Sequence, residues 1–205
     1  MTRPEPVPVD LCSQGGMLAV ADGPELLVYD ADGRPVWKHF CDSIIVGVAS
    51  SPTEILVLDA EGTLLRFRAM DGVEVDRGSV GRVGGLARTG NGALIVWDRN
   101  GVSFLANSAS PPRDVIQSKV LAAGLGPDGA SVGVTLSGGL FRAVDPVSGT
   151  AWGECTLPGD GHSVDWSTLG FWVVTAGHHL CLVAGDGTEV IAAIPGATAR
   201  LGEVS

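Results

Sequence analysis

Acidic residues, together with one arginine and two histidines, stand in the short polar loops between apolar segments, where side chains are free to meet a ligand. The candidate binding residues are Asp42, Asp59, Asp98, Arg99, His162 and His178. Hydrolysis of a glycosidic bond would need two or three carboxylates that converge, one as the acid and one as the base or nucleophile. Asp10, Asp42 and Asp165 are the candidates for that role, but no flanking motif supports them. We therefore expect no catalytic residues.

Three histidines near the C-terminal end, His162, His178 and His179, carry the imidazole that zinc sites use. His178 and His179 are adjacent, so in a strand their side chains would point to opposite faces and could not bind one ion together. No cysteine or carboxylate completes a convincing set of ligands, and no phosphate-binding loop is present. We expect neither a metal site nor a cofactor.

The elements that must position these residues repeat along the chain. A short apolar strand recurs five times, and the copies begin at Leu18, Ile55, Leu94, Val132 and Trp172. A period near 40 residues with strand–turn–strand texture is typical of a β-propeller, in which each repeat forms one four-stranded blade. The sequence therefore predicts an all-β fold, a propeller of about five four-stranded antiparallel blades, either closed or an open arc.

We expect a single propeller domain over residues 1–205. The predicted blades span residues 7–40, 44–77, 82–116, 120–157 and 163–194. Residues 197–205 would form a terminal strand, which is tucked into a closed five-bladed ring or begins a sixth blade at the end of an open arc. An open arc would leave strand edges that a partner must cover.

Two segments resemble the outer hairpin of quinoprotein-like repeats, in which a turn glycine precedes a tryptophan that docks between neighbouring blades. They are residues 28–37 and 141–152, and the resemblance implies that Trp37 and Trp152 are buried structural residues between blades. Residues 94–98 equally resemble a middle strand of WD-repeat blades. The resemblance covers most of the chain at the level of repeat type, and it implies a fold without any chemistry.

Charge and cysteine content restrict the class of partner. The net charge is −10 and the 13 basic residues are scattered, so we expect no binding to nucleic acid. No apolar stretch approaches the roughly 20 residues of a membrane-spanning helix, so we expect no membrane association. The four cysteines have no metal-ligand spacing, which favours reduced thiols in a cytoplasmic protein.

These observations favour a non-catalytic protein–protein interaction module, or a scaffold subunit of a larger assembly. The expected partner is another protein, which would complete the ring or pair with a terminal blade. The alternative is a lectin-like propeller that binds a carbohydrate or small ligand, although such lectins repeat their binding residues in every blade and these loops differ. A carboxylate-based hydrolase is the less favoured enzyme alternative.

Overall fold

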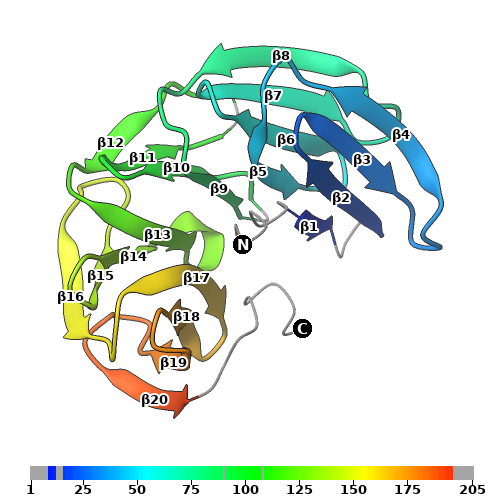
Figure 1. Ribbon diagram of the computed structural model, residues 1–205. Helices are drawn as coiled ribbons and strands as arrows, with labels where there is room; N and C mark the ends of the chain where they lie inside the picture. Colours follow the sequence, from blue (N-terminus) through cyan, green and yellow to red (C-terminus); the bar gives the residue numbers. More distant parts are fainter. Residues whose placement is uncertain (1–8, 13–15, 90, 108, 196–205) are drawn as a thin grey trace, which may run out of the picture. The chain divides into compact units, whose positions relative to one another are not determined.

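The computed structural model describes residues 9–12, 16–89, 91–107 and 109–195, and within them almost every regular element is a β-strand (Figure 1). In these described segments the strands form five sheets, each of four antiparallel strands. In every sheet the strands follow one another in chain order, so that each sheet is a simple meander. The all-β class and the four-stranded antiparallel sheets predicted from the repeat are confirmed.

The strands lie within a few residues of the predicted ones. The first sheet contains β1 (Val9–Cys12), β2 (Met17–Asp22), β3 (Glu25–Tyr29) and β4 (Pro35–Phe40). The second contains β5 (Ile45–Ser50), β6 (Glu54–Asp59), β7 (Thr63–Arg68) and β8 (Glu74–Ser79). The third contains β9 (Gly85–Arg88), β10 (Leu94–Asp98), β11 (Gly101–Leu105) and β12 (Arg113–Ile116).

The fourth sheet contains β13 (Val120–Leu125), β14 (Val132–Leu136), β15 (Leu140–Val144) and β16 (Ala151–Thr156). The fifth contains β17 (Gly161–Ser167), β18 (Gly170–Thr175), β19 (His179–Val183) and β20 (Val190–Pro195). One short 3-10 turn, Pro127–Gly129, connects β13 to β14. The predicted terminal strand at 197–205 lies outside the described residues. No helix in the described part of the chain has the length and apolar character needed to cross a membrane.

Contacts divide the chain into two compact units, Met1–Leu86 and Ala87–Ser205. In the first unit, the first and second sheets share one apolar core, which includes Val28 and Phe67, both fully buried. In the second unit, one core gathers residues of the third and fourth sheets and another gathers residues of the fourth and fifth. Each sheet therefore buries apolar side chains against its neighbour in the same unit, as burial of apolar surface requires.

Trp37 links the first sheet to the second. Its Nε1 donates a hydrogen bond to the carbonyl oxygen of Ala69 at 2.8 Å, and its ring lies 5.9 Å from that of Phe67. Gly72 lies directly under the indole, because a Cβ at this position would come within 2.6 Å of the ring. Gly72 also has a φ of +68°, so both the close approach and the backbone conformation require glycine here.

Trp152 does not share this position, and the expectation that it is buried between blades is wrong. The side chain is 48% exposed. Ala143 pairs with Gly153 and Val144 pairs with Ala151, so that Trp152 is the extra residue of a β-bulge in β16. A bulged residue leaves the ladder, and its side chain need not follow the alternation of the strand.

The bulge of the first sheet explains the difference between the two tryptophans. There Val28 pairs with Trp37, and the extra residue is Val36. Trp152 is therefore equivalent to Val36, and Gly153 is equivalent to Trp37. A shift of one residue along a strand reverses the face to which a side chain points. As a result, Trp37 docks on the next sheet and Trp152 does not.

The same bulge recurs in the second and fifth sheets, where the extra residues are Val75 and Ile191. All four bulge residues are apolar and exposed. Their exposed fractions are 44% for Val36, 47% for Val75, 48% for Trp152 and 54% for Ile191. Because the bulge removes these side chains from the packed faces, burial in the core does not explain their apolar character.

Candidate protein-binding surface

Two of the candidate carboxylates hold hairpin turns. Asp59 is only 4% exposed, and its Oδ1 accepts hydrogen bonds from the backbone N–H groups of Glu61 and Thr63 at 2.9 and 2.8 Å. Oδ1 of Asp98 accepts hydrogen bonds from the backbone N–H groups of Asn100 and Gly101 at 2.7 and 3.2 Å. Such side-chain-to-backbone bonds stabilise turns. These carboxylates therefore serve the fold at the ends of β6 and β10.

Asp42 lies between the first and second sheets and takes part in a surface ion-pair group. Its Oδ2 lies 3.3 Å from Nη1 of Arg77, whose Nε donates a hydrogen bond to Glu74 at 2.7 Å. The Arg77 guanidinium holds the pKa of the Glu74 carboxyl below its ordinary value. Because the Asp42 side chain is 85% exposed, this ion pair contributes little to stability.

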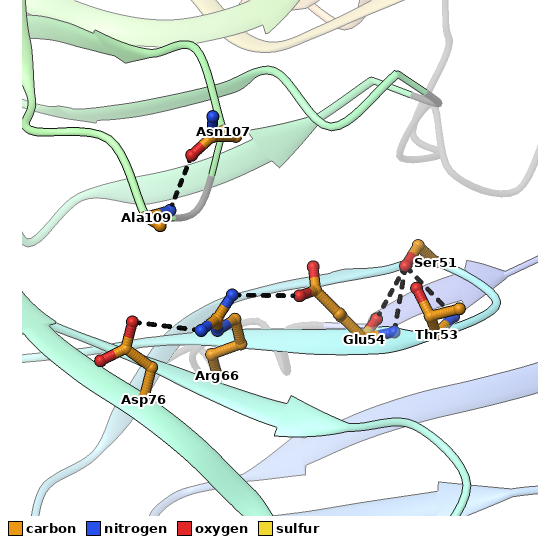
Figure 2. A network of polar contacts seen from close by, with 7 residues as sticks. All are labelled: Ser51, Thr53, Glu54, Arg66, Asp76, Asn107 and Ala109. Atoms are coloured by element: carbon orange, nitrogen blue, oxygen red, sulfur yellow. Dashed lines mark hydrogen bonds and ion pairs between the residues drawn. The ribbon is translucent and has the colours of Figure 1, made fainter.

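Arg66 organises a second group of charges, on the second sheet (Figure 2). Its guanidinium lies 3.3 Å from the carboxylate of Glu54 and 3.3 Å from that of Asp76. The three residues belong to β6, β7 and β8, so the group crosses three neighbouring strands. Here too the charges pair with one another within the sheet.

The remaining candidates, Arg99, His162 and His178, are exposed. His162 is the extra residue of a bulge in β17, and His178 occupies the turn between β18 and β19. His178 has a φ of +57°, a conformation that other turns of this protein give to glycine, as at Gly62. Within the described residues, no group of three or more histidine, cysteine, aspartate or glutamate side chains is arranged to hold a metal ion.

One sequence pattern that resembles a hydrolase nucleophile does not form one. Gly129, Ser131 and Gly133 have the spacing of a nucleophile elbow, in which serine sits on a sharp turn from a strand into a helix. In this structure the segment runs from a 3-10 turn into β14, and Ser131 is only 2% exposed. The serine is therefore not presented to a substrate.

Three of the four cysteines are also poor nucleophiles. Cys41, Cys155 and Cys181 are free thiols. Burial raises the pKa of Cys41 to about 11, with a further rise from the charges of Asp59 and Asp42. Burial likewise raises the pKa of Cys155 to about 11. Since the thiolate is the reactive form, these thiols have low reactivity at neutral pH.

The most unusual surface is the edge strand β20 of the fifth sheet. All six of its residues, Val-Ile-Ala-Ala-Ile-Pro, are apolar, yet five of the six are exposed. Ile191 is 54% exposed and Ile194 is 53% exposed. The last strands of the other four sheets each carry charged residues. An exposed apolar edge strand favours contact with another protein chain.

The face of the fifth sheet that continues from β20 is apolar on the two middle strands, whereas on β17 it carries Ser163 and Asp165, which pair with Val174 and Trp172. In β18 and β19, Phe171, Val173, Cys181 and Val183 are fully buried against the fourth sheet. The side chains between them belong to the opposite face, where Trp172, Val174 and Leu180 are partly buried and Leu182 is 7% exposed.

The first sheet shows the corresponding pattern on one of its faces. Leu18, Val20, Leu27 and Tyr29 occupy the positions that Phe171, Val173, Cys181 and Val183 occupy in the fifth sheet. The residues of the fifth sheet are fully buried, whereas those of the first sheet are partly exposed. The first and fifth sheets therefore each leave apolar side chains of their two middle strands partly exposed on one face.

Comparison with known proteins identifies the architecture. The chain is similar to the β-propeller domain of Cps50 (Swd1) from Myceliophteria thermophila, with a TM-score of 0.76 and 10% sequence identity. The match covers 91% of this chain and 71% of that chain. No family model matches the sequence, and no curated protein matches it. At this identity the similarity shows the fold and no activity. The fold predicted from the repeat is confirmed: the chain is a β-propeller.

Proposed function

We propose that this protein is a non-catalytic protein-interaction module that assembles with another protein through its terminal sheets. The observation that carries the proposal is β20, an edge strand made only of apolar residues, of which five in six are exposed. An apolar surface of this kind is costly to leave in water, and a partner that covers it gains roughly 25 cal/mol for each Å² of apolar area. The partner would complete the propeller or pair with a terminal sheet.

Two further observations support this function over a lectin or a hydrolase. The carboxylates of Asp59 and Asp98 accept backbone hydrogen bonds in turns, which occupies the groups that a sugar or a cation would need. Ser131 is buried. Cys41, Cys155 and Cys181 are free thiols, which supports our proposal of a reducing, cytoplasmic location.

Affinity capture under native conditions tests the function. The wild-type chain should retain a protein in stoichiometric amount, and the retained protein should be released when Ile191 and Ile194 are both changed to Asp. Met70 is 77% exposed and lies in the turn between β7 and β8 of the other compact unit, so Met70→Asp is the matched control. Binding of simple sugars in the millimolar range without any protein partner would contradict the proposal.

A further inference from the structure

Two of the three asparagines of the chain, Asn91 and Asn100, are followed by glycine. Glycine has no Cβ, so its backbone nitrogen is unhindered and can attack the side-chain amide of the preceding asparagine. The nitrogen bonds to Cγ of the asparagine, ammonia leaves, and water opens the resulting succinimide to aspartate or isoaspartate. Asn91 and Asn100 are exposed in the turns at the two ends of β10, so water reaches both.

At Asn100 the polar contacts oppose this reaction. Oδ1 of Asp98 accepts hydrogen bonds from the backbone N–H groups of Asn100 and Gly101 at 2.7 and 3.2 Å. The Gly101 nitrogen must lose its proton to become the nucleophile, and the negative charge of the adjacent carboxylate disfavours that loss. Nδ2 of Asn100 also donates a hydrogen bond to Oδ2 of Asp98 at 3.4 Å. Asp98 therefore holds both the attacking group and the leaving group of this turn.

At Asn91 the polar contacts have the opposite effect. Its side-chain oxygen Oδ1 accepts hydrogen bonds from the backbone N–H of Ala93 at 3.2 Å and from the Thr89 hydroxyl at 2.5 Å. A backbone N–H can only donate, so the Asn91 atom that faces it is the oxygen and not the amide nitrogen. The Thr89 hydroxyl also lies 3.3 Å from the carbonyl oxygen of Ala93, but it has a single hydrogen and the contact with Asn91 is the shorter one.

The two donors point at the atom on which negative charge develops. When the Gly92 nitrogen attacks Cγ of Asn91, the side-chain oxygen becomes an oxyanion, and hydrogen bonds to that oxygen stabilise the tetrahedral intermediate. The N–H of Gly92 donates a hydrogen bond to the carbonyl oxygen of Thr89 at 3.0 Å. This acceptor is neutral, so it opposes ionisation of the Gly92 nitrogen less than a carboxylate would.

We propose that Asn91 is a site of spontaneous deamidation in this protein, and that Asp98 protects Asn100 from the same reaction. Deamidation converts a neutral amide into a carboxylate, and an isoaspartate also lengthens the backbone by a carbon in the turn that precedes β10. Leu94 and Ile95 at the start of β10 are fully buried, and a packed interior tolerates such a shift poorly. The isoaspartyl form should therefore unfold more easily. The inference goes beyond the proposed function and does not depend on it.

Peptide mapping by mass spectrometry tests the inference within one molecule. The purified full-length protein is incubated at mildly alkaline pH, and the deamidated fraction is followed at Asn91 and Asn100. Asn91 should react about tenfold faster than Asn100. In the urea-unfolded chain, which lacks these contacts, the two should react at similar rates, because glycine follows each. Equal rates in the folded protein, a faster reaction at Asn100 or no reaction at either site would overturn the inference.

Substitutions test the two contacts separately. Asp98→Asn keeps an oxygen that accepts backbone hydrogen bonds but removes the charge, so deamidation at Asn100 should become about tenfold faster. Thr89→Val removes one donor and should slow deamidation at Asn91 about fivefold, the effect of one hydrogen bond. Thr89→Ser keeps the hydroxyl and should react as the wild type does.

Circular dichroism checks that each variant is folded, and the comparison of the two sites in the wild-type protein needs no variant. Unchanged rates in folded Asp98→Asn and Thr89→Val would overturn the inference. Capture of a partner protein is measured separately, so either proposal can fail while the other stands.

Discussion

Replacing Trp37 tests the contact between the first and second sheets most directly. The Trp37→Ala substitution removes the indole that packs against Phe67 and lies over Gly72, together with the 2.8 Å hydrogen bond to the carbonyl oxygen of Ala69. Truncation of a large aromatic residue in a core costs about 3–5 kcal/mol. Trp37 is only partly buried, so we expect a loss of about 3 kcal/mol, or about 6–12 °C in Tm for a chain of this length.

Two further substitutions divide that cost. Trp37→Phe keeps an aromatic ring but removes the N–H donor, and a lost hydrogen bond costs about 1 kcal/mol. Gly72→Ala places a methyl group 2.6 Å from the indole, so its cost should fall by about 1–2 kcal/mol when Trp37 is already alanine. Part of the cost should persist in both backgrounds, because φ at Gly72 is +68°.

The measurement is urea-induced unfolding of each variant, followed by far-UV circular dichroism because tryptophan is the residue that is changed. Trp152→Ala is the control, because a side chain that is 48% exposed in a bulge should contribute about 0.5 kcal/mol. If Trp152→Ala costs as much as Trp37→Ala, the assignment of Trp152 to the bulge and of Trp37 to the inter-sheet contact is wrong.

Three other predictions follow from local geometry. Gly153→Ala should destabilise the protein by about 2 kcal/mol or more, because the new Cβ would lie 2.1 Å from a turn carbonyl oxygen of the fifth sheet. Gly78→Ala is the control, because Gly78 has open space around it, and it should be neutral or slightly stabilising in the same unfolding assay. His178→Gly should raise stability by a few tenths of a kcal/mol to about 1 kcal/mol, because a φ of +57° strains a residue with a Cβ, and thermal unfolding would detect the gain. The thiols of Cys41 and Cys155, with pKa values of about 11, should react with iodoacetamide about 100-fold more slowly at pH 7 than an ordinary thiol of pKa 9.0. Labelling followed by mass spectrometry should show the rate of alkylation of both thiols rising with pH up to about pH 11.

The sequence was sufficient for the strands but not for their register. Apolar segments at a period near 40 residues, with Asp and Gly between them, are local signals, and they located all five sheets. Trp152 was misplaced because the pattern of apolar and polar residues does not reveal the bulge in the outer strand. Trp152 occupies the bulge itself, whereas Trp37 stands one residue after it. The spacing from the turn glycine does distinguish the two tryptophans, because Trp37 follows its glycine by four residues and Trp152 follows its glycine by three.

The role of the loop carboxylates could not be decided from the sequence for a different reason. An Asp that precedes a turn glycine, as at Asp59 and Asp98, suits both a ligand site and a turn that is held by its own side chain. Only the direction of the carboxylate, toward backbone N–H groups, distinguishes the two. The exposure of β20 could not be predicted from the sequence either, because an uninterrupted run of apolar residues in a strand usually indicates burial.

The apolar edge of β20 has a consequence for how the isolated protein behaves in solution. Ile191 and Ile194 favour self-association, while the net charge of −10 keeps the molecules apart. The range of that repulsion shrinks from about 30 Å at 0.01 M salt to about 10 Å at 0.1 M. Purified alone, the protein should therefore remain dispersed in dilute buffer and aggregate as salt is added. Ionic strength would then control whether the apolar strands of two molecules come into contact.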